Sequence, residues 1–133
     1  MKVARITVDE AREYFAHPSQ QKGAQITPDA LPGDPFEYWA CSGVCGVFHQ
    51  DHWPGVWMAH YGVMPWAWGR TAKPARAILQ TFCDTHDPAQ IIGWTDAANR
   101  AALSFARRIG FRETGRISLP DGAVVMTEFR TWQ

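Results

Sequence analysis

Residues 63–73 have the sequence VMPWAWGRTAK and mark an abrupt change in the hydrophobic pattern of the chain. The preceding segment, VWMAHYGV (56–63), has the length and composition of a β-strand. After the stretch, apolar residues recur at helical spacing, at Ala75, Ile78, Leu79, Phe82 and Cys83. Because proline is tolerated only in the first turn of a helix, Pro74 predicts a helix that begins near Ala72. The sequence here therefore predicts a strand, a glycine-containing loop and a helix in succession.

The other predicted elements extend from this junction in both directions. Toward the N-terminus we expect a strand (2–8), a helix capped by Asp9 (9–16), a proline-rich loop (17–35) and two strands (36–42 and 44–50). Toward the C-terminus we expect a strand (90–95), a helix (99–110) and two strands joined by a Pro-Asp-Gly turn (111–119 and 123–132). The order β-α-β-β-β-α-β-α-β-β predicts an α/β fold with a mixed, mostly antiparallel sheet flanked by helices.

Composition narrows the class of protein. The length of 133 residues fits one domain over 1–133, and thirteen basic residues balance thirteen acidic ones, which argues against a nucleic-acid partner. No apolar run is long enough to span a membrane. The N-terminus is acidic from Asp9 onward and lacks the apolar region of a signal peptide, and three cysteines make an odd number. These features predict a cytoplasmic protein with free thiols and no membrane partner.

A second motif lies in residues 99–111, NRAALSFARRIGF, where an Asn opens a helix and Gly-Phe follows its end. Together with residues 63–73, and in this order, the motif resembles the GNAT acetyltransferase family, in particular its compact bacterial and phage members. The resemblance covers residues 36–133 well and residues 9–35 weakly. It implies the GNAT fold, binding of acetyl-coenzyme A and transfer of the acetyl group to an amine.

The resemblance also implies a coenzyme site. Backbone N–H groups at the start of a helix suit phosphate oxygens, so the pyrophosphate is expected on the loop at Trp68, Gly69, Arg70, Thr71, Ala72 and Lys73. The pantetheine arm is expected to pair with the backbone of Gly62 and Val63. Asn99 either contacts this arm or simply caps its helix. The family usually has Arg or Gln at Trp68, Gly at Thr71, and Gly or Ala at Lys73, so a plain strand-to-helix loop capped by Thr71 is the alternative.

In the GNAT family the amine attacks the thioester directly, so the resemblance implies that no nucleophilic side chain is needed. The resemblance assigns the Val63 N–H to the thioester carbonyl. Candidate bases are His60, Asp96 and Glu37, with His49 as a further one, since histidine titrates near neutral pH. His60 could equally be a structural histidine of its strand, and Asp96 could simply begin the next helix. A water chain without a single base is also open.

One position departs from the family pattern. Many members carry a Tyr four residues before the Gly of Gly-Phe, where it protonates the leaving thiolate, and this chain has Ala106 there. The departure favours an alternative function, a non-catalytic GNAT-like domain that binds a ligand or a partner protein. The acceptor itself is left open as a small-molecule or peptide amine. Unpaired strand edges could drive formation of a homodimer.

Four residues offer a third interpretation, a zinc site. Cys41, Cys45, His49 and His52 supply sulfur and imidazole ligands within twelve residues. The spacing lacks the tight C-x2-C pair of zinc knuckles, and both cysteines fall in strand segments where small apolar residues are expected. Packing in the core explains them, so we predict no metal.

Overall fold

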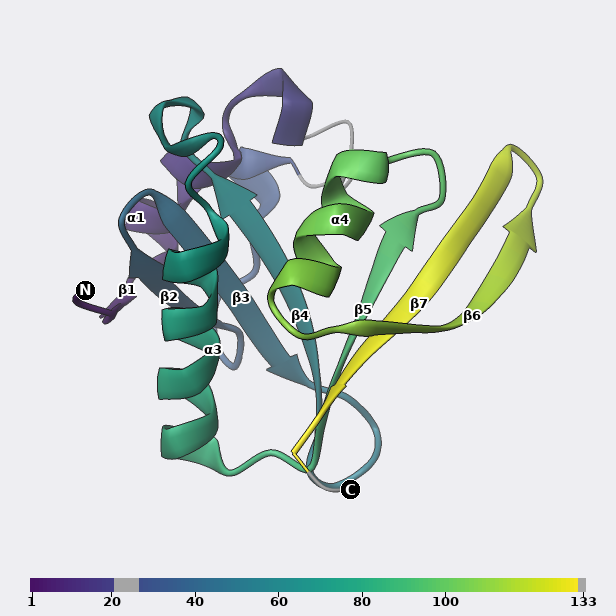
Figure 1. The fold of residues 1–133 in the computed structure, drawn as a ribbon. Helices are drawn as coiled ribbons and strands as arrows, with labels where there is room; N and C mark the ends of the chain where they lie inside the picture. The colour runs from purple at the N-terminus through teal and green to yellow at the C-terminus, as the bar shows by residue number, and fades with distance from the viewer. Residues whose placement is uncertain (21–26, 132–133) are drawn as a thin grey trace.

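A computed structural model describes residues 1–20 and 27–131. Seven strands form one sheet in the order β1-β2-β3-β4-β5-β7-β6 (Figure 1). Their bounds are β1 Ala4–Ile6, β2 Glu37–Cys41, β3 Val44–Gln50, β4 Val56–Val63, β5 Gln90–Asp96, β6 Arg112–Leu119 and β7 Gly122–Arg130. The pairing of β4 with β5 is parallel, and the other neighbours in the sheet are antiparallel. The predicted mixed sheet is confirmed.

Helices lie on both faces of this sheet. They are α1 Val8–Ala11, the 3-10 helices η1 Arg12–Phe15, η2 Pro28–Ala30 and η3 Pro65–Ala67, and the longer α3 Ala72–His86 and α4 Arg100–Arg108. Figure 1 shows α3 and α4 in front of the sheet and α1 behind it. We call these the front and rear faces. The element order agrees with the prediction, and α3 begins at Ala72 as Pro74 requires.

The first helix differs from its prediction. It begins at Val8 and lasts one α-helical turn before continuing as η1, and its N-cap is Thr7 rather than Asp9. Thr7 accepts a hydrogen bond from the N–H of Glu10 at 3.1 Å, and Glu10 accepts one from the N–H of Thr7 at 3.0 Å. This reciprocal pair satisfies two N–H groups at once, which a cap at Asp9 would not do. Asp9 instead pairs with Arg12 at 2.7 Å.

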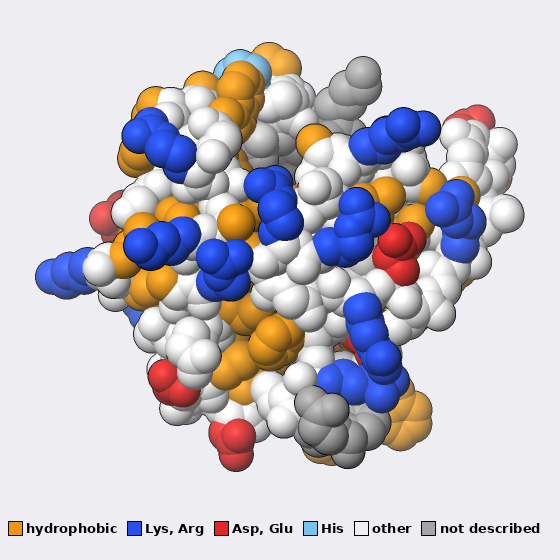
Figure 2. All heavy atoms as spheres, in the orientation of Figure 1, with side chains coloured by type: hydrophobic (Ala, Val, Ile, Leu, Met, Phe, Trp, Pro, Cys, Tyr) orange, Lys and Arg blue, Asp and Glu red, His pale blue; other side chains and the backbone are white. Residues whose placement is uncertain are grey.

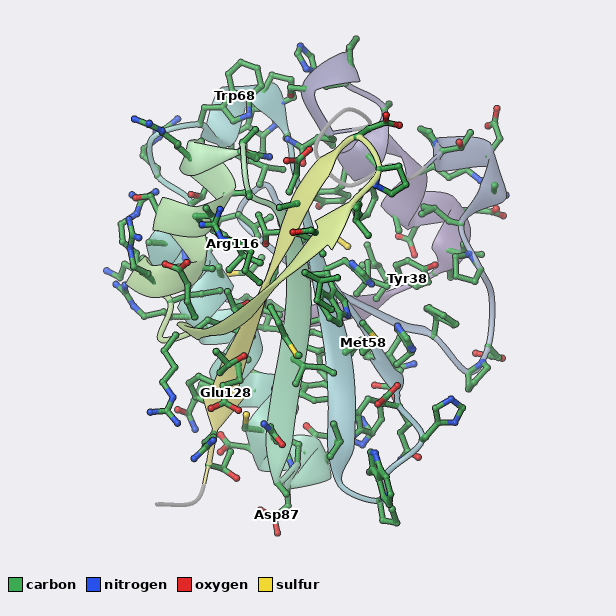
Figure 3. All side chains as sticks on the ribbon, turned by 90° about the vertical axis from the view of Figure 1, so that its right-hand side faces the viewer. Tyr38, Met58, Trp68, Asp87, Arg116 and Glu128 are labelled. Atoms are coloured by element: carbon green, nitrogen blue, oxygen red, sulfur yellow. The ribbon has the colours of Figure 1, made fainter. Side chains whose placement is uncertain are left out.

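Two hydrophobic clusters hold the helices on the sheet, because successive residues of a strand face opposite sides. On the front face, Phe82 of α3 stacks on Phe48 of β3 with ring centroids 4.0 Å apart. The rear cluster gathers residues from α1, η1, β2 and β3, namely Ala11, Phe15, Tyr38, Cys45 and Val47. In the side view of Figure 3, Tyr38 and Met58 lie on the opposite side of the sheet from α3 and α4.

Because successive residues of a strand face opposite sides, the two cysteines considered as zinc ligands lie on different faces of the sheet. Cys41 belongs to the front cluster, whereas Cys45 belongs to the rear cluster. Their sulfur atoms therefore lie on opposite faces of the sheet and cannot share a metal ion. Within residues 1–20 and 27–131, no helix is long and apolar enough to cross a membrane.

Candidate coenzyme and acceptor site

Strands β4 and β5 separate part of the way along their length. Their parallel ladder comprises Val56–Met58 and Gln90–Ile92 and then stops. Beyond it, β4 continues beside β3 to Val63, and β5 continues beside β7 to Asp96. We call residues 59–63 and 93–96 the fork. Figure 1 shows the arrowheads of β4 and β5 apart, with α4 in front of the space between them.

The backbone of Val63 is directed into the fork. The next residue, Met64, donates its N–H to the carbonyl of Gly43 at 2.8 Å, on the β3 side. Since neighbouring peptides along a strand face opposite edges, the N–H of Val63 faces the fork. It donates to the side-chain carbonyl of Gln20 at 3.2 Å. A donor in this position could equally serve an acyl carbonyl or an extended ligand chain.

Gly62, the other predicted partner of the pantetheine arm, is oriented differently. By the same alternation its peptide faces β3, where it pairs with Cys45. A side chain at Gly62 would lie 2.7 Å from the ring of Phe15 in η1. The glycine is therefore needed for η1 to pack against β4, and of the two predicted backbone partners the geometry favours Val63.

The loop between β4 and α3 presents an open backbone at a helix N-terminus. Gly69 has φ +85°, and no atom lies within 4 Å of where its side chain would be. The N–H groups of Ala72 and Lys73 lie in the first turn of α3 and have no acceptor within the helix. Thr71 is buried at the N-cap position, and its side chain makes no capping hydrogen bond. These groups suit a phosphate, as the prediction for this loop requires.

Two predicted side chains of the loop lie on its outer surface. Trp68 is half exposed, and its ring meets the edge of His17 with centroids 5.0 Å apart. Arg70 folds back and donates to the carbonyl of Trp66 at 2.8 Å. Both can reorient toward a ligand without disturbing the core.

Basic side chains gather on the front face. Figure 2 shows them spread over α3 and α4, the helices that carry Lys73, Arg76, Arg100, Arg107 and Arg108. The whole chain has a formal net charge of zero, so this face is positive while other parts are not. Such a surface attracts a ligand with several phosphates.

His60 lies on the rear face of β4, where it lines a cavity of about 280 Å³. The other lining residues come from η2, the chain on either side of it and β3, and are Thr27, Ala30, Leu31, Pro32, Phe36 and Val47. Burial lowers the pKa of His60, and the neighbouring His49 lowers it further. The imidazole is therefore neutral at pH 7 and can accept a proton.

Aromatic rings hold His60 in place. The ring of His49 stacks on Phe36 with centroids 4.3 Å apart and lies parallel to His60 at 5.9 Å. The loop that closes the cavity is tied to the sheet because the Tyr38 hydroxyl donates to the carbonyl of Pro32. Of the two predicted histidine bases, His60 belongs to the fork itself. His49 lies on the neighbouring strand β3, next to His60.

Glu37 lies two strands away from the fork, since it pairs with Phe48 of β3 and Phe48 pairs with Ala59 of β4. It lies on the front face of β2, where it contacts His86 at 2.8 Å, the indole N–H of Trp39 at 3.1 Å and Arg5 at 3.5 Å. His86 ends α3, whereas the fork lies beside the beginning of that helix. Its Oε1 makes all three contacts, so the environment of Glu37 favours a structural role over that of the predicted base.

The side chains of Asp96 and Asn99 both accept hydrogen bonds from backbone N–H groups in the segment that follows β5. Asp96 is exposed and accepts from the N–H of Ala98 at 2.9 Å, as expected for a residue that starts a turn. Asn99 accepts from the N–H of Ala102 at 3.1 Å and so caps α4. The capping alternative for Asn99 is thus the one seen, and its amide NH2 is the group left for a ligand.

The expected tyrosine position is occupied by Ala106, which packs in the front cluster. A different tyrosine lies nearby, since the ring of Tyr61 meets Phe105 of α4 with centroids 5.4 Å apart. The Tyr61 hydroxyl is buried and has no hydrogen-bond partner among the described residues. Burial raises the pKa of this hydroxyl far above its ordinary value.

Comparison with known proteins shows the fold. No family model and no curated protein matches the chain. Among solved structures, the aminoglycoside acetyltransferase AAC(6')-Ib with coenzyme A and kanamycin has a TM-score of 0.73 and 15% identity over 98% of this chain and 94% of that one. Spermidine N-acetyltransferase SpeG from Vibrio cholerae has a TM-score of 0.77 and 9% identity, over 98% and 95%. A GNAT-family acetyltransferase from Bacillus anthracis has a TM-score of 0.74 and 14% identity, over 96% and 93%.

The fold of this chain is therefore that of the GNAT acetyltransferases, as the two motifs predicted. The sequence did not reveal the contact of Gln20 with Val63 or the cavity at His60. Both depend on residues far apart in the chain, and no periodicity or local spacing signals them.

Proposed function

We propose that this protein is an acetyl-coenzyme A-dependent N-acetyltransferase. The observation that carries the proposal is the fork, with the Val63 N–H directed into it and the His60 cavity on the rear face of the same strand. The coenzyme's pyrophosphate would lie on the loop at Gly69 and the start of α3, with its acyl arm in the fork. The amine would approach from the cavity.

The transfer step follows from these positions. The lone pair of the neutral amine attacks the thioester carbonyl carbon, and the C–S bond breaks as the amide C–N bond forms. The Val63 N–H hydrogen-bonds the carbonyl oxygen as negative charge develops on it. The amine's proton passes to the neutral imidazole of His60, either directly or through one water. The thiolate leaves with the electron pair of the C–S bond and takes its proton from water.

The coenzyme's phosphates have matching groups on this chain. The open backbone at Gly69 and the N–H groups of Ala72 and Lys73 would hold the pyrophosphate. The basic side chains on α3 and α4 add long-range attraction to the same region. Solved neighbours of this fold are described as complexes with acetyl-coenzyme A or coenzyme A, which supports the same assignment.

A thiol-release assay tests the proposal. Purified protein, acetyl-coenzyme A and a panel of primary amines are mixed, and free coenzyme A and acetylated amine are quantified together. We expect release that depends on both the amine and the enzyme. His60→Ala should lower kcat by about 100-fold or more, as for loss of a general base, with little change in coenzyme affinity. Equal turnover by this variant would remove His60 from the mechanism.

A second function, binding without catalysis, is favoured by two observations. The Val63 N–H already has an acceptor in Gln20, and Ala106 supplies no acid for the thiolate. In this case acetyl-coenzyme A or a partner would bind without turnover. Saturable coenzyme binding together with the absence of acetylated product for every amine tested would favour this second function.

A further inference from the structure

We infer that the acceptor is a compact amine on an apolar or aromatic body, rather than a polycation such as a polyamine or an aminoglycoside. The inference rests on the proposed function and concerns the same site. It comes from the side chains that line the cavity at His60, and it separates this chain from the solved neighbours named for spermidine and aminoglycosides.

Among the described residues, the side chains that line the cavity are apolar apart from two. Leu31, Pro32, Phe36 and Val47 supply hydrocarbon surface, and the polar side chains are those of Thr27 and His60. Such a wall favours burial of the apolar part of a ligand, at about 25 cal/mol for each Å² removed from water. The exposed ring of a substrate could also lie against Phe36, which already stacks with His49.

The charges of the residues around the cavity also favour a monoamine over a polycation. None of the described residues that line the cavity carries a carboxylate. Of the two acidic residues next to lining residues in sequence, Asp29 is exposed and Glu37 contacts His86 on the front face. Burying an ammonium group without a paired carboxylate is costly. A polyamine or an aminoglycoside carries several such groups, and the histidine that lines this wall is neutral.

The same environment helps the reaction. An apolar cavity disfavours the charged form of a bound amine and so lowers its pKa. A monoamine therefore enters the site partly as the neutral base that attacks the thioester, and His60 removes the proton that remains after attack. With a polycation, burial would have to neutralise several nitrogens for one productive attack.

Size supports a small acceptor. A cavity of about 280 Å³ lies just below the range of roughly 300–1,000 Å³ that is usual for drug-sized ligands. It has room for an amine with one ring, whereas an aminoglycoside with several sugar rings would extend beyond its walls.

The test compares 2-phenylethylamine with spermidine and kanamycin at equal concentrations of amine and saturating acetyl-coenzyme A. Thr27→Glu places a carboxylate at the cavity wall, and Thr27→Gln is the control of equal size without charge. The Thr27 side chain makes no capping hydrogen bond to η2, so neither substitution removes a cap. Thermal unfolding and coenzyme titration verify that both variants fold and bind.

We expect kcat/KM for 2-phenylethylamine to exceed that for spermidine by about tenfold or more, a difference of about 1.4 kcal/mol. Thr27→Glu should narrow this ratio, whereas Thr27→Gln should leave it unchanged. Preference of the unmodified protein for spermidine or kanamycin would overturn the inference while leaving the proposed function intact. Absence of turnover with all three amines would overturn both.

Discussion

The N–H of Val63 is hydrogen-bonded to the side-chain carbonyl of Gln20 at 3.2 Å, although the two residues are 43 positions apart in the chain. This N–H is the donor proposed for the thioester carbonyl. Under the proposed function, Gln20 occupies the place of the substrate oxygen and withdraws when the coenzyme binds.

Removing the Gln20 side chain should strengthen coenzyme binding. A hydrogen bond of this kind contributes about 0.5–1.5 kcal/mol, so Gln20→Ala should lower the Kd for acetyl-coenzyme A by about two- to tenfold. Calorimetric titration measures the change, and Gln50→Ala, an exposed glutamine on β3, serves as the control. Weaker binding by Gln20→Ala would mean that Gln20 supports the site rather than competing for it.

A bulky residue at Gly69 should block the coenzyme without unfolding the protein. Gly69 has φ +85° and open space around it, so a Trp side chain adds backbone strain of about 1 kcal/mol and covers the phosphate site. Gly122→Trp is a matched control, since Gly122 also has positive φ and open surroundings but is the first residue of β7, paired with Leu119. Coenzyme titration and thermal unfolding distinguish the effects. Unchanged affinity for Gly69→Trp would place the phosphates elsewhere.

The pH dependence of activity should report His60. Because burial and then His49 lower the pKa of His60, its neutral, proton-accepting form persists somewhat below the ordinary histidine value of 6.5. We expect kcat/KM to be constant near pH 7 and to fall as the pH drops through this lowered pKa. His49→Phe keeps an aromatic ring beside Phe36 but removes the neighbouring charge, so the acid limb should move to higher pH. An acid limb that does not move would mean that His49 has no influence on the pKa of the catalytic base.

Substitution of Tyr61 tests the unpaired hydroxyl. A buried hydroxyl without a partner costs about 1–3 kcal/mol, so Tyr61→Phe should raise the free energy of unfolding by an amount in this range. Urea denaturation measures the change, and Tyr38→Phe is the control, because its hydroxyl donates to Pro32 and its loss should destabilise. Loss of stability in Tyr61→Phe would show that the hydroxyl has a partner in solution.

Local patterns predicted most of the fold. The strands β3 and β4 have the predicted bounds and α3 begins at the predicted residue, because alternation, Pro74 and nearby turn residues act over a few positions. The first helix was misplaced by one residue and overlong, since Thr7 and Glu10 form a reciprocal cap that outweighs Asp9. From the sequence, capping was one of two roles predicted for Asn99, because Asn at a helix start caps the helix in many proteins.

The site was less predictable because it depends on register and on long-range contacts. Glu37 has a carboxylate, which is suited to act as a base. However, the pairing of β2 with β3 places it beside His86, at the C-terminal end of α3. Gly62 was predicted to pair with the coenzyme, and only the position of Phe15 reveals its packing role. The wall of the His60 cavity combines residues around η2 with residues of β3, which no single segment of sequence displays.

The central claim is that the fork and the loop at Gly69 bind acetyl-coenzyme A, and calorimetric titration of the pure protein tests it most directly. The account predicts saturable binding with a Kd near or below about 100 µM, roughly −5.5 kcal/mol. It also predicts loss of that binding in Gly69→Trp but not in Gly122→Trp. The absence of binding at millimolar acetyl-coenzyme A would contradict the coenzyme site and the acetyltransferase function with it.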